Sequence, residues 1–206
     1  RLHDRGFSVD PTVRERVTAI LARVRTEGDA ALRALARELD GAELDALEVP
    51  RETLARALDA LDPALRRVME RAANNIARVH GAMIPTAIEV ESEPGVVVGR
   101  RPDPLTRVGV YAPGGRAPYP SSVLMGVIPA RVAGVHEIIL CSPPVRGSTL
   151  PSDVVLAAAA LAGVDRVFAL GGAGAIAAMA MTGMRKFTVH VGIVKETPPD
   201  AILRRR

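Results

Sequence analysis

Apolar residues recur at helical spacing in four stretches of the first hundred residues. The stretches begin at Pro11, Asp29, Pro50 and Pro63, and the last of them is the longest. Proline loses no needed donor in the first turn of a helix, and the aspartates that precede two of these prolines can cap free backbone amides. We therefore predict four helices in this part of the chain, each of which buries its apolar stripe in a core.

The period of the pattern changes after the fourth helix. Two β-branched runs, at 88–90 and 96–98, flank Glu93-Pro-Gly95 and predict a β-hairpin. From Val108 onward, short β-branched runs alternate with Ala-rich stretches, which is typical of a parallel sheet with crossover helices. The expected elements are strands at 107–111, 136–141, 166–170 and 186–195, and helices at 120–133, 152–162 and 173–182.

The whole pattern predicts an α/β fold class with two parts. Residues 1–104 are expected to form a helical N-terminal region with a β-hairpin, and Pro102 and Pro104 mark the joint. Residues 105–206 are expected to form a Rossmann-like three-layer domain with a mostly parallel sheet. This second domain is expected to be incomplete, with a divergent tail at 181–206.

Composition narrows the class of protein. Hydrophobic residues make up 48% of the 206 positions and charged residues 24%, which is ordinary for a soluble globular chain. Aromatic residues make up only 2%, with no Trp, so stacking platforms for single-stranded nucleic acid are largely excluded. The sequence has no signal pattern and no apolar run of membrane-spanning length, and its one cysteine, Cys141, fits a reducing compartment. We expect a cytoplasmic protein without a membrane partner.

The net charge of +4 is unevenly distributed along the chain. Residues 105–206 hold 11 Lys/Arg against 5 Asp/Glu, so this part carries the positive excess. A basic domain can attract nucleic acid or an anionic cofactor. The basic residues are scattered or lie in the tail at 204–206, and no helix shows a basic stripe. We therefore interpret them as solvated and expect no nucleic-acid partner.

The most informative segment is 108–125, which reads Val-Gly-Val-Tyr-Ala-Pro-Gly-Gly-Arg-Ala-Pro-Tyr-Pro-Ser-Ser-Val-Leu-Met. It predicts a strand, a Gly-Gly turn and a helix N-terminus, an arrangement that receives phosphate or other anions. As a literal string, this segment resembles the histidinol dehydrogenase family. The resemblance continues at 27–32, 93–96, 128–135, 138–144, 157–165 and 171–178.

The resemblance covers only the N-terminal half of such enzymes. It runs from roughly position 10 to position 180, and residues 181–206 depart from the family pattern. The sequence also begins with Arg1 rather than Met. We therefore expect a fragment, and truncation, a frameshift or a replaced tail would each explain it.

The resemblance implies an NAD-dependent dehydrogenase of histidine biosynthesis, which oxidises L-histidinol in two steps through an aldehyde to L-histidine. It also implies a homodimer, a Zn²⁺ ion that holds the substrate and a Glu-His pair that moves protons. In the family, the zinc ligands and that pair come from the second half, and their motifs are missing from this sequence. We therefore assign no catalytic residue and no metal ligand here, and expect the chain to be inactive alone.

Three candidate cofactor-binding residues follow from the resemblance. Tyr111 matches the family tyrosine that lies against NAD, and Pro113 lies in the same turn. Gly174 occupies the position of a family glutamine that contacts NAD, and glycine has no side-chain amide for that contact. Arg116 and Tyr119 fall in the turn after Tyr111 and are expected to border the pocket.

Two other functions remain open from the residues themselves. The segment 172–177 matches G-x-G-x-x-A after a predicted strand, and Glu196 follows at the end of the next expected strand, where a ribose-binding acid would sit. This pattern favours a stand-alone nucleotide-binding module, although it also fits a tight turn between a buried strand and a buried helix. The third hypothesis is a non-catalytic assembly fragment. No metal-ligand spacing links the four histidines, which are His3, His80, His136 and His190.

Overall fold

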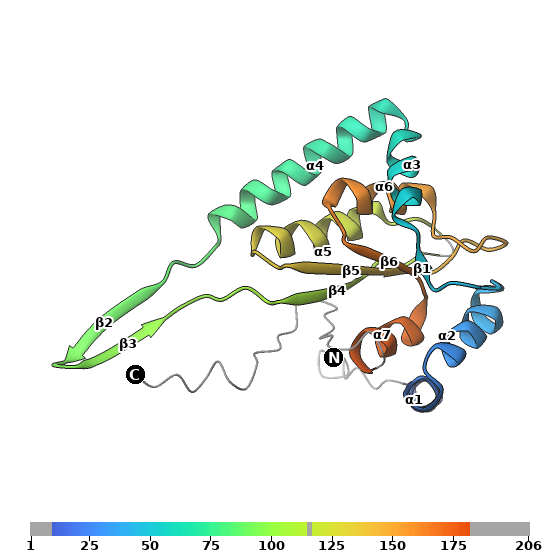
Figure 1. Cartoon of the computed structure of the whole chain (residues 1–206), viewed down its shortest axis with the longest axis horizontal. Coiled ribbons are helices and arrows are strands. Elements are labelled where there is room, and N and C mark those ends of the chain that lie inside the picture. Colours follow the sequence, from blue (N-terminus) through green and yellow to red (C-terminus); the bar gives the residue numbers. More distant parts are fainter. Residues whose placement is uncertain (1–9, 115–116, 182–206) are drawn as a thin grey trace, which may run out of the picture.

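The computed structural model describes residues 10–114 and 117–181 (Figure 1). Its helices are α1 Pro11–Glu27, α2 Asp29–Leu35, the π-helix η1 Ala36–Asp40, α3 Arg51–Asp59, α4 Pro63–Ala82, α5 Pro120–Val132, α6 Asp153–Ala162 and α7 Gly172–Met181. Its strands are β1 Glu48–Val49, β2 Ile88–Glu93, β3 Val96–Arg100, β4 Arg107–Tyr111, β5 Glu137–Ser142 and β6 Arg166–Ala169. The strand expected at 186–195 lies outside the described residues, as does Glu196.

A four-stranded sheet in the order β1-β6-β5-β4 forms the centre of the molecule. Strands β4, β5 and β6 are parallel, with Val110 level with Leu140 and Leu140 level with Val167. The α/β fold class with a mostly parallel sheet is thereby confirmed. One strand was not expected, since β1 comes from the N-terminal region and pairs antiparallel with β6 at the edge.

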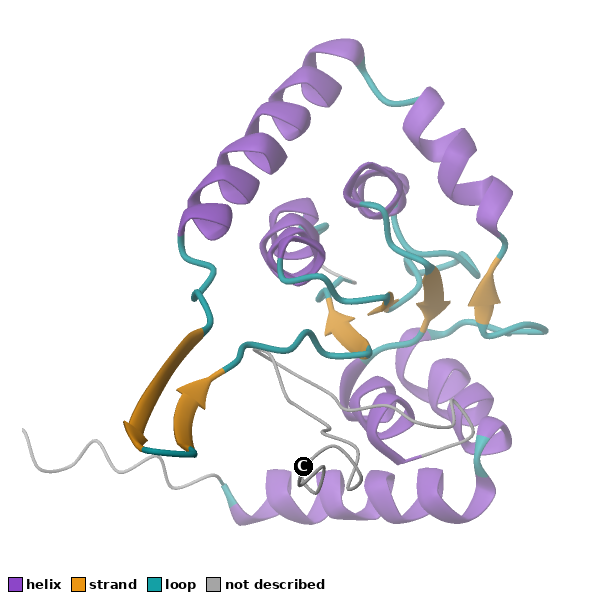
Figure 2. Cartoon of the chain, turned by 60° about the vertical axis from the view of Figure 1, so that its left-hand side comes forward, coloured by secondary structure: helices purple, strands orange, loops and turns teal. Residues whose placement is uncertain are grey.

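Helices cover both faces of this sheet (Figure 2). Helices α5 and α6 lie on one face, while α7 lies on the other face beside α2 and α1. Helices α3 and α4 pack outside α6 and α5. Ala157, Ala158 and Ala159 of α6 are fully buried, and their small side chains allow close helix packing on this side. The N-terminal helices therefore contribute to the same hydrophobic core as the sheet.

Local sequence explains where two of the N-terminal helices begin. The Asp10 carboxylate accepts a hydrogen bond of 2.9 Å from the Thr12 backbone N–H. The Asp62 carboxylate accepts two, each of 2.9 Å, from the backbone N–H groups of Ala64 and Leu65. Proline follows each aspartate in the first turn. These contacts confirm the predicted starts of α1 and α4.

A polar cluster holds the amino ends of the parallel strands together. The Asp165 carboxylate, just before β6, accepts a hydrogen bond of 2.7 Å from the Ile138 backbone N–H in β5 and another from the Arg131 guanidinium of α5. Arg131 also donates to three backbone carbonyl groups. The cluster fixes the amino ends of the strands by polar contacts. The opposite, carboxyl ends of the strands are left to form a site.

The β2–β3 hairpin projects from this body as an arm (Figures 1 and 2). Its strands pair antiparallel from Ile88 with Arg100 to Glu93 with Val96. The chain reverses at Gly95, whose φ of 80° suits a residue without a Cβ atom. The predicted hairpin is confirmed, but every residue of its two strands is exposed, so its valines lie outside the core.

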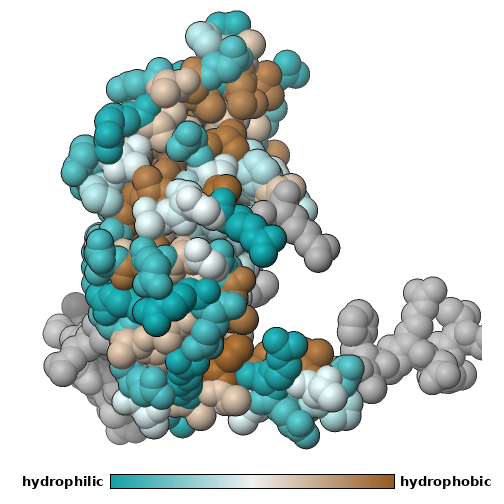
Figure 3. Space-filling view, turned by 90° about the vertical axis from the view of Figure 1, so that its right-hand side faces the viewer, coloured by the Kyte–Doolittle hydropathy of each residue, from teal (hydrophilic) through white to brown (hydrophobic). Residues whose placement is uncertain are grey.

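The surface on the side of the molecule away from the arm is mixed in polarity. Figure 3 shows hydrophilic residues over most of this face, with hydrophobic residues in separate patches between them. Within the described part of the chain, no helix is both long enough and apolar enough to cross a bilayer.

Candidate functional site

The carboxyl ends of the three parallel strands lie together at one end of the sheet. Tyr111 ends β4, Ser142 ends β5 and Ala169 ends β6. In open α/β sheets, ligands bind outside the carboxyl ends of the strands. We call this end of the sheet the strand-end site. It includes the turns that follow the three strands, at 112–114, 143–152 and 170–171.

Tyr111 extends across the strand-end site from β4 to the start of α7. Its hydroxyl oxygen accepts a hydrogen bond of 3.1 Å from the Gly172 backbone N–H. The side chain is half-buried, so part of the ring remains accessible. Pro113 is exposed in the turn that follows. A Cβ atom added to Gly172 would have no other atom within 4 Å, so the space beside this contact is open.

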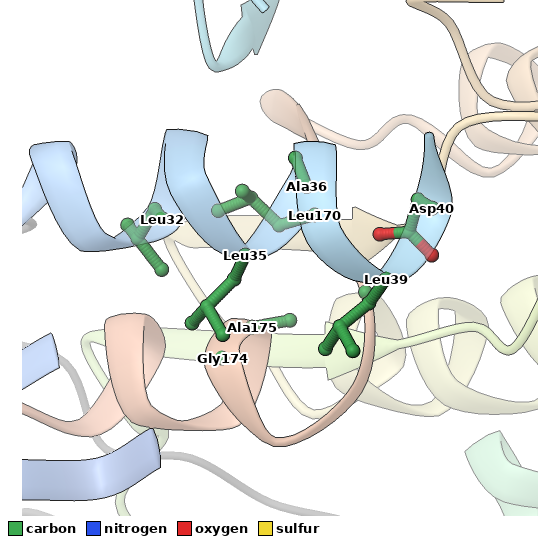
Figure 4. A pocket seen from close by; sticks show the side chains of 9 residues that line it. Leu32, Leu35, Ala36, Leu39, Asp40, Leu170, Gly174 and Ala175 are labelled. Atoms are coloured by element: carbon green, nitrogen blue, oxygen red, sulfur yellow. The ribbon is translucent and has the colours of Figure 1, made fainter. Parts of the chain in front are cut away.

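Gly174 faces helix α2 (Figure 4). A Cβ atom at this buried glycine would lie 3.1 Å from Leu35 Cδ1 and 3.8 Å from Leu32 Cδ2. The cavity beside it has a volume of about 10 Å³, which is room for one water molecule. The missing side chain therefore allows α2 to pack closely on α7, and the cofactor role of Gly174 stays a prediction.

The first turn of α7 is poorly suited to a phosphate group. The Gly172 backbone N–H already donates to Tyr111. The Asp40 carboxylate also lies close by, because a Cβ atom at Gly171 would be 3.1 Å from Asp40 Oδ2. Burial raises the pKa of the Asp40 carboxyl above its usual value. A carboxylate beside this turn disfavours a second anion there, which weakens the interpretation of 172–177 as a stand-alone nucleotide site.

A second cavity, of about 200 Å³, lies on the other side of the strand ends. Its walls come from the turn after β4, the end of β5 and the first turn of α6. Two serines line it, Ser142 and Ser152, and the remaining walls are mainly apolar side chains, among them Pro118, Pro143 and Val155. Neither serine belongs to a motif that predicts a site from the sequence. The available signal was a polar residue directly after the apolar run 138–141.

The other candidate residues from the sequence do not add a reactive group to the strand-end site. Cys141 is fully buried, and burial raises the pKa of its thiol to about 12, so the nucleophilic thiolate is scarce at neutral pH. Tyr119 is 46% exposed and immediately precedes α5. Arg116 lies outside the described residues, as do His3 and His190. Among the residues that the structure describes, no three His, Cys, Asp or Glu side chains are grouped to hold a metal ion.

Comparison with known proteins identifies the family. The model of the histidinol dehydrogenase family matches residues 4–193, which include every described residue. This chain belongs to the histidinol dehydrogenase family. Over 182 residues it is 49% identical to a histidinol dehydrogenase of Methanosarcina mazei, an alignment that covers 87% of this chain and 41% of that protein.

Other members of the family show the same partial coverage. A histidinol dehydrogenase of Halobacterium salinarum is 50% identical over 179 residues, which cover 87% of this chain and 41% of that protein. The crystal structure of histidinol dehydrogenase from Elizabethkingia anophelis superimposes with a TM-score of 0.76 at 32% identity, covering 81% of this chain and 38% of that one. The chain thus spans about two fifths of the length of these histidinol dehydrogenases.

Proposed function

We propose that this chain forms the NAD-binding part of a histidinol dehydrogenase and holds the cofactor through the turn that begins at Tyr111. The observation that carries the proposal is the Tyr111 ring at the carboxyl end of β4, hydrogen-bonded to Gly172, in a chain of this family. Tyr111 supplies a ring beside the open space at Gly172, and Pro113 adds an exposed apolar surface in the turn that follows Tyr111. Gly174 contributes close packing of α2 rather than a polar contact.

The proposed reaction of the complete enzyme is the oxidation of L-histidinol to L-histidine in two NAD-dependent steps. When bound, NAD supplies the hydride acceptor for each oxidation. An alcohol also needs a base for its proton, and we assign that role to none of the described residues. The described residues do not fit Zn²⁺ either, because they offer no group of three ligands. We therefore assign the proton transfer and the zinc site to the remainder of a family enzyme, together with the cytoplasmic location and the homodimer that the family resemblance implies.

Cofactor binding is tested by titrating the purified chain with NAD in a calorimeter. Tyr111→Ala removes the ring and is expected to weaken binding about 10-fold, equivalent to about 1.4 kcal/mol. The control is Val97→Ala, which truncates an exposed side chain on the β2–β3 arm and is expected to leave binding nearly unchanged. Glu196→Ala is also expected to change little. If Glu196→Ala weakens binding more than Tyr111→Ala, the stand-alone nucleotide module is the better description.

Activity is tested by mixing the chain with NAD, zinc and L-histidinol and following NADH absorbance. We expect no turnover by the chain alone, and turnover only after a separately expressed second half of a family enzyme is added. Turnover by the isolated chain would contradict our assignment of the chemistry to that second half. Absence of turnover in the mixture, together with absence of NAD binding, would favour the non-catalytic assembly fragment.

A further inference from the structure

Strand β4 forms one edge of the central sheet and has a neighbouring strand on one side only. The Ala112 N–H, just after β4, donates a hydrogen bond of 3.0 Å to the Cys141 carbonyl oxygen of β5. The backbone groups of successive residues point to alternate sides of a strand, so those of Gly109 and Tyr111 point away from β5. Within the described part of the chain, no strand lies on that side to pair with them.

In its packing, β4 resembles a strand from the interior of a sheet. Val108 and Val110 are only 3% and 7% exposed, and Gly109 between them is buried. Helices cover both faces of the strand. A Cβ atom at Gly126 of α5 would lie 2.7 Å from Val110 Cγ1, and one at Gly109 would lie 2.6 Å from Met179 Sδ of α7. Buried backbone groups are nearly always paired, so the covered edge of β4 calls for a partner strand.

The opposite edge of the sheet is protected against further pairing. Strand β1 is only two residues long, its Glu48 is charged and exposed, and Pro50 follows it directly. Short strands, charges and prolines are the features that keep natural sheet edges from pairing. Residues 108–111 of β4 contain neither a charge nor a proline. The two edges therefore differ, and only the edge at β4 is built to accept a strand.

The handedness of the chain predicts where its next parallel strand lies. The chain passes from β4 to β5 and on to β6 through α5 and α6, which lie on one face of the sheet. Helix α7 follows β6 on the opposite face (Figure 2). Crossovers between parallel strands are almost always right-handed, so a helix on the opposite face leads back toward β4. Strand β5 already has two neighbours, which leaves the free edge of β4 as the available position.

Helix α7 also carries the chain to this edge. Its contact between Met179 and Gly109 places the end of the helix against the middle of β4. The chain continues beyond Met181, and the strand expected at 186–195, outside the described residues, begins after a connection of four residues. Connections of 2–6 residues are usual between a helix and the next strand of such units.

We propose that residues 186–195 form a parallel strand on the free edge of β4. Apolar residues alternate along this segment, so that one face of the strand carries Phe187, Val189, Val191 and Ile193. The backbone groups of the segment pair with the outward-pointing groups of Gly109 and Tyr111. The added strand ends beside Tyr111 and forms a further wall of the strand-end site. This inference does not depend on the proposed binding of NAD.

The test measures amide hydrogen exchange in the full chain by NMR. We expect the Gly109 amide to exchange at least about 100-fold more slowly than in the unfolded chain. Because successive amides of a strand point to opposite sides, either His190→Pro or Val191→Pro removes a donor to β4, and that variant should accelerate exchange at Gly109 at least about 10-fold. The Ala112 amide, which bonds to β5, should stay protected and shows that the sheet remains folded. The matched control is Ala201→Pro, which introduces proline beyond the segment and should change neither amide.

The outcomes distinguish this strand from other occupants of the edge. Fast exchange at Gly109 in the unaltered chain, with Ala112 protected, overturns the proposal because the edge is then open. Slow exchange that neither proline variant changes also overturns it, and acceleration on dilution would then identify a second copy as the occupant. If the proline variants unfold the sheet, nuclear Overhauser contacts in the unaltered chain decide. Contacts between Gly109 and residues 186–195 support the strand, and their absence overturns it.

Discussion

The central sheet and the β2–β3 arm are built from similar residues but differ completely in burial. Strand β5 contains Ile138, Ile139 and Leu140, each 0% exposed. Strand β3 contains three consecutive valines, at 96–98, and they are 47% to 62% exposed. Helices cover both faces of β5, whereas no described element packs on the arm. An apolar run therefore predicts a strand, and the elements packed around it decide whether that strand is core.

This difference sets how much stability each region contributes. Burying a large aliphatic side chain is worth about 1.5 to 3 kcal/mol. A two-stranded hairpin without a covered face is marginally stable in water. We therefore expect the sheet to dominate the free energy of unfolding and the arm to contribute little.

The comparison is tested most strongly by truncating one apolar residue in each region. Leu140→Ala leaves a cavity in the fully buried centre of β5 and should lower the free energy of unfolding by about 3 to 4 kcal/mol. Val97→Ala on the exposed arm should change it by less than about 0.5 kcal/mol. Urea denaturation followed by circular dichroism measures both. Similar losses in the two variants would show that the arm is buried in solution.

Thiol labelling compares the two regions without altering the core. Burial raises the pKa of the Cys141 thiol to about 12, so at pH 8 it should react with a thiol reagent on the order of 100-fold more slowly folded than in urea. A thiol introduced by Val97→Cys should react at nearly the unfolded rate. Fast labelling of Cys141 in the folded chain would contradict the described sheet.

The same thiol makes stability depend on pH. Its ordinary pKa is 9.0, and its folded pKa is the higher of the two, so the buried thiol is favoured below pH 9. Its contribution should decline as the pH rises from there toward 12.

Removing a polar contact should also lower the free energy of unfolding more in the central sheet than in the arm. Asp165→Ala removes the acceptor for the buried Ile138 N–H and for Arg131, and should lower the free energy of unfolding by about 2 kcal/mol. The matched change at the base of the arm is Asp103→Ala, which breaks an exposed pair with Arg101 and should cost less than about 0.5 kcal/mol. Chemical denaturation of the two variants side by side provides the measurement. A larger loss for Asp103→Ala would reverse the ranking of the regions.

The smallest expected effect concerns the ion pair between the edge strand β1 and its neighbour β6. The Arg166 guanidinium holds the pKa of the Glu48 carboxyl below its usual range. A lowered folded pKa stabilises the fold above the unfolded pKa, and this contribution is lost as the pH falls through the folded value. Glu48→Gln should therefore cost about 0.5 kcal/mol at pH 7 and nothing near pH 3. In the arm, Glu91→Gln should change little at either pH, since its amide oxygen can still accept the Gly95 N–H.

The sequence was sufficient to predict most elements, because their signals are local. The capped starts of α1 and α4 and the turn at Gly95 depend on residues adjacent in the chain. Strand β1 was missed because its two residues carry no period of their own, and its pairing with β6 depends on contact between distant segments. The π-helix at 36–40 was missed for a similar reason, since its residues continue the helical pattern of α2.

The candidate site was predicted less completely than the fold. The position of Tyr111 at a strand end follows from its own sequence, but its hydrogen bond to Gly172 joins residues 61 apart. Ser142 and Ser152 are single serines without a motif, and only the packing of α6 at the end of β5 brings them to one cavity. Gly174 lies in a G-x-G pattern that predicts a ligand, and the structure places Leu35 of α2 against it, so its cofactor role stays a prediction.

The pairing of β1 with β6 constrains how this chain folds as the ribosome makes it. Glu48 and its partner Arg166 are 118 residues apart. At 5–20 residues per second, about 6 to 24 s pass between their synthesis. The face of α3 that carries Leu54 and Ala57 packs on α6, which is translated in the same late interval. The nascent N-terminal region therefore exposes an unprotected apolar face for seconds, and this is the stage of its biogenesis at which a chaperone would matter most.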